Sequence, residues 1–101
     1  AEISTESLTA AFRIFQESLT NIARHAKAGQ VEASCVISNG VLTLRVRDNG
    51  VGMDPAIATR PDSLGLLGMM ERACHAGGTL IFEGCTGKGT EVVLTIPPSG
   101  R

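Results

Sequence analysis

Residues 31–47, VEASCVISNGVLTLRVR, decide the fold of this chain. Asn39 and Gly40 stand at the centre of the stretch, and both residue types tolerate the positive φ of a two-residue hairpin turn. In the second half, apolar residues occupy alternate positions, at Leu42, Leu44 and Val46. That alternation gives a strand one apolar face. The stretch therefore predicts two antiparallel strands, Val31–Ser38 and Val41–Arg47.

A helix is expected before this hairpin, from Ser4 to Ala28. Apolar residues recur there at steps of three and four, at Leu8, Ala11, Phe12, Phe15, Leu19, Ile22 and Ala23. Such spacing places one apolar stripe along an α-helix. Gly29 suits the end of the helix because glycine accepts a left-handed backbone.

After the hairpin, residues 48–64 are rich in Gly, Pro and Asp and show no sustained periodicity, which predicts a long loop. The pattern then predicts a second helix, Gly65–Gly77, and two further strands, Thr79–Gly84 and Thr90–Pro97, joined by a Gly-rich turn at 86–89. This order predicts an α/β two-layer sandwich with a mixed, largely antiparallel sheet and helices on one face. With 101 residues the chain forms one domain. A loop of this length in so small a domain is usually functional or disordered.

Composition excludes several classes of function. Hydrophobic residues make up 43% of the chain and the net charge is -1, so there is enough apolar material for a core but no basic field for nucleic acid. No apolar run approaches the roughly 20 residues of a membrane-spanning helix. The three cysteines are an odd number, widely spaced, and form no zinc or CxxC pattern. We expect a soluble domain from a reducing compartment.

Polar residues on the first helix are candidates for a metal site. Glu17, Asn21 and His25 are spaced four apart, so they would stack along one helix face, with Arg24 beside them. The apolar stripe centres elsewhere, so this row should border the buried face without belonging to it. A carboxylate and an amide oxygen one turn apart can share Mg²⁺ while leaving it water and phosphate ligands. The alternative is an ordinary solvated helix face.

The end of the second strand is a candidate binding site. Asp48 stands where the strand ends and can accept a hydrogen bond from an exocyclic amine. Gly50 and Gly52 would let the backbone approach a flat base, and Val51 and Met53 would add apolar contact. The alternative is a Gly-rich turn without a ligand, since Asp, Asn and Gly are common turn residues.

The start of the second helix is a candidate phosphate site. Gly65 and Gly68 frame the segment Gly65–Met69, and exposed amides at a helix start suit phosphate oxygens. Glycine inside a helix costs up to about 1 kcal/mol relative to alanine, so two within one turn need a reason. Close packing is the competing reason.

Taken in this order, four stretches resemble the motifs of the catalytic, ATP-binding domain shared by histidine kinases, gyrase, Hsp90-type chaperones and mismatch-repair ATPases. Residues 16–26 resemble the N box, 48–54 the first glycine box, 65–69 the second, and 87–90 the last conserved turn. Within this superfamily the chain looks most like sensor kinases related to the nitrate/nitrite sensors and to the membrane-fluidity sensor of bacilli. The resemblance implies a Bergerat-type ATP-binding fold.

The resemblance also implies a role for each matching residue. Asp48 would bind the adenine amino group, with Thr90 helping directly or through a water. Asn21 would hold Mg²⁺, and Glu17 would support the metal's water shell, with a role as base only second. The other residues of the implied nucleotide site are Arg24, His25, Gly50, Gly52, Met53, Gly65, Leu66, Gly68, Met69 and Gly89. Residues 55–64 would form a mobile lid.

In such kinases the phosphorylated histidine lies on a separate dimeric helical hairpin. Neither His25 nor His75 matches the acceptor motif, so we expect an excised donor domain that is monomeric and does not phosphorylate itself. It would bind MgATP and pass the γ-phosphate to a histidine of the dimerisation domain, from which a response regulator receives it. We expect it to be the cytoplasmic part of a membrane-bound sensor.

Two rival hypotheses share this fold. An anti-sigma factor of the serine-kinase type has the same N box, but its second glycine box usually differs from the Gly-Leu-Leu-Gly-Met of residues 65–69. A nucleotide-sensing module without phosphotransfer would need a damaged metal site, whereas Glu17 and Asn21 are both present.

Overall fold

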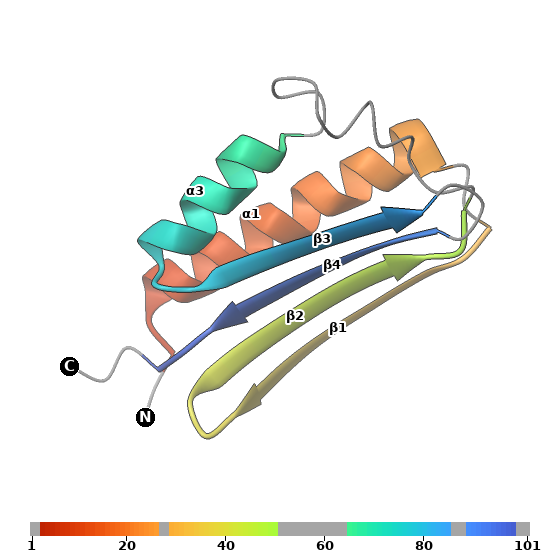
Figure 1. Ribbon diagram of the computed structural model, residues 1–101. Coiled ribbons are helices and arrows are strands. Elements are labelled where there is room, and N and C mark those ends of the chain that lie inside the picture. The colour runs from red at the N-terminus through yellow and green to blue at the C-terminus, as the bar shows by residue number, and fades with distance from the viewer. Residues whose placement is uncertain (1–2, 27–28, 51–64, 86–88, 99–101) are drawn as a thin grey trace.

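The computed structural model shows a four-stranded sheet with its helices packed over one face (Figure 1). The structure describes residues 3–26, 29–50, 65–85 and 89–98. The helical elements are α1 (Thr5–Asn21), its π-helical continuation η1 (Ile22–Ala26) and α3 (Leu66–His75). The strands are β1 (Val31–Ser38), β2 (Val41–Asp48), β3 (Thr79–Cys85) and β4 (Gly89–Ile96). No helix in these ranges is long and apolar enough to cross a membrane.

Local signals in the sequence fix the ends of the helices. Helix α1 begins after Ser4, whose hydroxyl oxygen accepts a hydrogen bond from the backbone N–H of Ser7 at 3.0 Å. Helix α3 ends where Gly77 adopts a φ of 80°. The N–H groups of Gly77 and Gly78 then donate to carbonyl oxygens of the last turn, at 2.9 and 2.7 Å, which is a Schellman motif. This motif turns the chain directly into β3.

The sheet has the strand order β1-β2-β4-β3, and its three pairings are all antiparallel. At the β1–β2 turn, Asn39 and Gly40 have φ angles of 53° and 79°, as the hairpin prediction requires. The predicted two-layer architecture with helices on one face is confirmed. The mixed sheet that the sequence allowed is not seen among the described strands, because the second hairpin returns beside β2 in the antiparallel sense.

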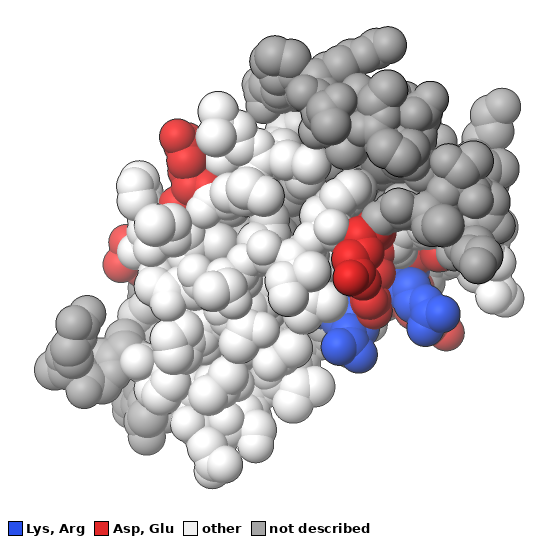
Figure 2. All heavy atoms as spheres, viewed as in Figure 1, with Lys and Arg blue, Asp and Glu red and all other residues white. Residues whose placement is uncertain are grey.

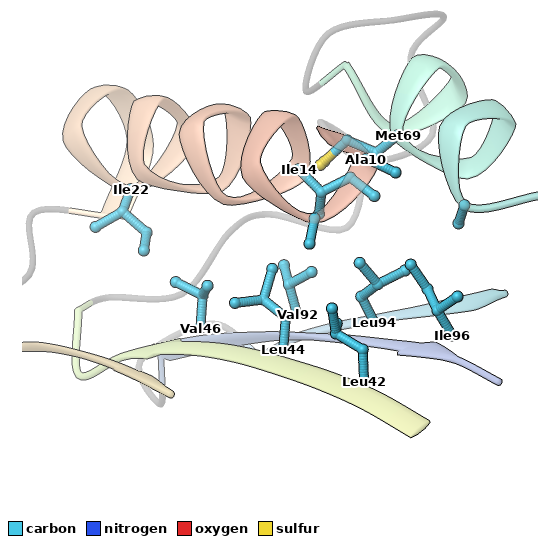
Figure 3. Packing of buried hydrophobic residues seen from close by; sticks show 12 residues of the cluster. Ala10, Ile14, Ile22, Leu42, Leu44, Val46, Met69, Val92, Leu94 and Ile96 are labelled. Atoms are coloured by element: carbon cyan, nitrogen blue, oxygen red, sulfur yellow. The ribbon is translucent and has the colours of Figure 1, made fainter. Parts of the chain in front are cut away.

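The core lies between the helices and the inner face of the two central strands (Figure 3). Cross-strand partners on that face are apolar in three successive pairs: Leu42 with Ile96, Leu44 with Leu94, and Val46 with Val92. Ile14 of α1 and Met69 of α3 cover these pairs from above, and both are at most 2% exposed. Burial of this apolar surface holds the two layers together.

The buried face of α1 differs from the predicted one. The helix buries mainly small or polar side chains, at Ser7, Ala10, Ala11, Ile14, Ser18 and Asn21. Leu8 and Phe12, which belong to the predicted apolar stripe, are 49% and 57% exposed. The reason is that α1 packs against α3 as well as against β2 and β4, and small residues permit this close approach. The larger apolar residues border an open groove above β1, a strand whose residues are all exposed.

Candidate functional site

The inner face of the sheet changes from apolar to polar at its fourth cross-strand pair, where Asp48 faces Thr90. Both residues are buried, at 4% and 6% exposure. The Thr90 hydroxyl donates to Asp48 Oδ2, and the backbone N–H of Gly50 donates to Oδ1 at 2.7 Å. A carboxylate offers about four lone-pair sites, so this one is held in place and can still accept hydrogen bonds from a ligand. An amine or amide donor fits it.

Gly89 brings these two side chains together. Its φ is 90°, and a Cβ atom there would collide with the backbone carbonyl oxygen of Asp48 and lie 3.3 Å from the Cα of Asn49. Only glycine lets β4 begin this close to the end of β2. Gly89, which the sequence placed in the nucleotide site, therefore acts by positioning Thr90 beside Asp48.

Asn49 is a structural part of the site that the sequence analysis missed. Its Oδ1 accepts hydrogen bonds from the backbone N–H groups of Gly29 and Gln30, at 3.0 and 2.9 Å. Its own N–H donates to the Gln30 carbonyl oxygen at 3.2 Å. These bonds fasten the chain that leaves η1 to the strand end that carries Asp48. The available signal was an Asn at a strand end, a residue type that commonly bonds nearby backbone groups.

The N-box residues lie where α1 ends. Asn21 is 4% exposed, so the expectation that it only borders the buried face is wrong. The face of α1 that is buried is the one with the small and polar residues, and Asn21 lies on that face. Glu17, one turn earlier, is half-buried. After Asn21 the helix widens into the π-helical η1, instead of continuing as an α-helix to Ala28, and π-turns are frequent at functional sites. The side chain of His25 lies outside the described residues.

The start of α3 faces this helix. Gly65 has a φ of 66°, and a Cβ atom there would lie 2.8 Å from Glu17 Oε2, so glycine makes room for the Glu17 carboxylate. The N-cap residue of α3, Gly65, forms no side-chain cap, and the first amides of the helix lack helical acceptors. At Gly68, a Cβ atom would meet no atom of the described residues within 4 Å, which argues against close packing as the reason for this glycine. Leu66 and Met69 direct their side chains into the core, with Met69 Sδ 4.0 Å from the Ser18 hydroxyl.

A polar cavity of about 400 Å³ joins the N box to the start of α3. Its lining residues are Arg13, Gln16, Glu17, Thr20, Arg24, Gly65, Gly68, Met69 and Arg72. Mg²⁺ prefers oxygen ligands and usually takes only one or two from the protein, with water and phosphate completing its shell. The Glu17 carboxylate lines this cavity and offers one such oxygen. Asn21, one turn further along α1, is buried and is not among the lining residues, so its amide oxygen is a second candidate through its position on the helix alone.

Part of the predicted site cannot be placed. Gly52, Met53 and the expected lid at 55–64 lie outside the described residues. Among the described ones, the structure brings Asp48, Gly50, Gly89 and Thr90 together at the strand ends. It gathers a second group around the polar cavity: Glu17, Arg24, Gly65, Gly68 and Met69.

The chain belongs to the family of histidine kinase-, DNA gyrase B- and HSP90-like ATPases, whose family model matches residues 7–100. It is thus an ATP-binding domain of the histidine kinase type. Sensor histidine kinase LiaS of Bacillus subtilis (strain 168) is 43% identical over 88 residues, covering 85% of this chain and 24% of LiaS. The histidine-protein kinase/phosphatase DegS of the same organism is 33% identical over 92 residues, covering 89% of this chain and 24% of DegS. The chain thus spans about a quarter of these relatives.

Solved structures agree with the fold. The histidine kinase domain of the blue-light activated histidine kinase from Erythrobacter litoralis EL346 superposes with a TM-score of 0.75 at 22% identity, over 93% of this chain and 46% of that one. The ATP binding domain of PrrB from Mycobacterium tuberculosis gives a TM-score of 0.70 at 24% identity, over 91% and 69% of the two chains. Both have the same arrangement of helices on a sheet.

Proposed function

We propose that this domain binds MgATP and donates its γ-phosphoryl group to a histidine on a separate helical dimerisation domain, within two-component signalling. The observation that carries the proposal is the buried Asp48 carboxylate. Thr90 and Gly50 hold it in place, and it retains the capacity to accept a hydrogen bond from the amino group of adenine. We also propose that the chain comes from the nitrate/nitrite-sensor-like branch of the sensor kinases.

The two halves of the site would receive the two ends of the nucleotide. Gly50, with Gly52 and Met53, would shape the adenine pocket around Asp48. The phosphates would lie in the polar cavity beside Arg24 and the open amides at the start of α3. Glu17, which lines this cavity, and Asn21, one turn further along α1, would hold Mg²⁺.

The reaction is a phosphoryl transfer between two domains. A nitrogen of the acceptor imidazole forms a bond to the γ-phosphorus, while the bond from that phosphorus to the bridging oxygen breaks and ADP leaves. Bound Mg²⁺ would neutralise charge on the phosphates. The chain itself contributes positioning, because Asp48 fixes the base and the α3 amides hold phosphate oxygens. Glu17 would support the metal first and serve as a base only second.

The response regulator would take the phosphoryl group from the dimerisation domain in a later step, so it is a partner of the whole kinase. We infer a cytoplasmic location for this domain. The net charge of -1 gives the chain no basic field for nucleic acid, so we infer no nucleic acid partner. The domain alone would be monomeric.

Calorimetry of ATP binding to Asp48→Ala tests the adenine assignment. A hydrogen bond to a charged group is worth about 1.5–3 kcal/mol, so affinity should fall about ten- to hundredfold. Glu83→Ala is the matched control, because Glu83 is exposed on β3 and its loss should leave affinity unchanged. Unchanged affinity in a folded Asp48→Ala protein would defeat the assignment.

A transfer assay tests the proposed reaction itself. The chain, γ-labelled ATP and a purified acceptor hairpin should give label on the hairpin that is acid-labile and alkali-stable. The chain alone should take up none. Acid-stable label on serine of an added protein would favour the anti-sigma type of kinase, and tight ATP binding without any transfer would favour a nucleotide-sensing module.

A further inference from the structure

The polar cavity is lined by two arginines that have no role in the proposed nucleotide site. Arg13 and Arg72 line it together with Arg24. Arg13 lies one turn before Glu17 on α1, and Arg72 lies one turn after Gly68 on α3. Because α1 and α3 pack against each other, these two arginines reach the same cavity from different helices.

Within the described ranges, none of the three arginines forms an ion pair with a carboxylate. The ion pair found there joins Arg45 to Glu91 at 3.2 Å, on the outer face of the sheet. Figure 2 shows basic and acidic side chains lying together on one side of the displayed face, with further acidic side chains apart from them near the opposite edge. In the cavity, by contrast, Glu17 is the one acidic residue among the lining residues, beside three guanidinium groups. Three guanidinium groups thus share the cavity with one carboxylate, and this excess of positive charge favours an anionic ligand there.

The position of the two arginines indicates which part of the nucleotide they meet. From Asn21 to Glu17 to Arg13, each step along α1 is four residues, or about 6 Å at 1.5 Å per residue. The Asn21 end lies toward the adenine side, because Ile22 stands over Val46, two residues before Asp48 (Figure 3). Arg13 is therefore the cavity residue of α1 farthest from the base, and Arg72 lines the same cavity from α3.

We propose that Arg13 and Arg72 bind the terminal phosphate of ATP and so distinguish ATP from ADP. This inference rests on the proposed function, because it takes the base to lie at Asp48. A guanidinium presents its N–H groups as a planar fork that matches phosphate oxygens, and its charge persists at any physiological pH. Two such groups from different helices would grip the γ-phosphoryl group, where charge accumulates during transfer.

The test compares ATP with ADP, both with Mg²⁺, by calorimetry on the wild-type chain and on Arg13→Gln, Arg72→Gln and the double variant. Each replacement should weaken ATP binding about tenfold, the lower value for a hydrogen bond to a charged group, and leave ADP binding within about twofold. The double variant should bind the two nucleotides alike. Arg45→Gln, which removes the same charge from the outer face of the sheet, should change neither affinity. Both cavity arginines are exposed, so the variants should fold, and thermal melting checks this.

Several outcomes would overturn the inference. They are equal losses for ATP and ADP, no loss for either, or a wild-type chain that does not prefer ATP to ADP. In each of these cases the nucleotide still binds, so the proposed function would survive. A wild-type chain that binds neither nucleotide would instead refute the proposed function, and the inference with it.

Discussion

Gly68→Ala should make the domain more stable and less able to bind ATP. Gly68 lies inside α3, where glycine costs about 0.5–1 kcal/mol relative to alanine. The added methyl group would meet no described atom within 4 Å, so no steric penalty offsets this gain. We therefore expect the free energy of unfolding to rise by about 0.5–1 kcal/mol. For a domain of this size, that raises the melting temperature by about 2–8 °C.

The same methyl group would occupy the space that we assign to phosphate. Gly68 lines the polar cavity at the open start of α3, so the methyl would keep phosphate oxygens away from the helix amides. Losing one charge-assisted hydrogen bond there should weaken ATP binding about ten- to hundredfold. Thermal melting without nucleotide measures the gain in stability, and calorimetry measures the loss of affinity.

Gly77→Ala is the matched control. It adds the same methyl group, also without a described atom within 4 Å, but at a φ of 80°. A left-handed backbone costs a non-glycine residue about 1–2 kcal/mol, so this variant should lose stability and keep its ATP affinity. If Gly68→Ala binds ATP as tightly as the wild type, Gly68 does not make room for phosphate, and if the variant melts no higher, the glycine does not cost α3 stability.

Three further predictions concern the rest of the site. Asn21→Ala should weaken MgATP binding far more than metal-free ATP binding, because its amide oxygen would serve the metal; calorimetry with and without Mg²⁺ decides, and equal losses would indicate a structural role. Asn49→Ala should lower the free energy of unfolding by about 1–3 kcal/mol, as it removes two hydrogen bonds to backbone N–H groups, whereas Asn49→Asp keeps the acceptor and should melt close to the wild type. Gly89→Ala should destabilise the domain and weaken ATP binding together, since its methyl would collide with the Asp48 backbone; unchanged melting and affinity would contradict the positioning role.

The strands could be predicted well because their signals are local. The Asn39–Gly40 turn and the alternating residues of β2 depend on chain neighbours alone, and all four strands begin or end within one residue of the predicted bounds. Helix α1 shows the opposite case. Its buried face is chosen by two surfaces at once, α3 and the sheet, so Leu8 and Phe12 are displaced outward while Asn21 is buried. Hydrophobic spacing alone contains no information about this second surface.

In the candidate site, too, the local sequence identifies single residues but not the contacts between distant ones. Asp48 and Thr90 could be singled out through their motifs, but their contact depends on the register of β2 with β4, which local sequence does not reveal. The role of Asn49 was missed for a related reason: its partners, Gly29 and Gln30, are 20 and 19 residues earlier in the chain.

The polar pair that ends the inner face of the sheet links nucleotide binding to folding. Three apolar cross-strand pairs fill the space between the layers, and the fourth, Asp48 with Thr90, offers hydrogen-bonding groups in place of apolar surface. A bound adenine would complete that layer as a side chain would. ATP would bind the folded chain and not the unfolded one. An ATP concentration of one hundred times the Kd would therefore add about 2.7 kcal/mol to the free energy of unfolding. In a chain of this size that is about 10–20 °C in melting temperature, so supplied nucleotide would protect the kinase domain from heat and proteolysis.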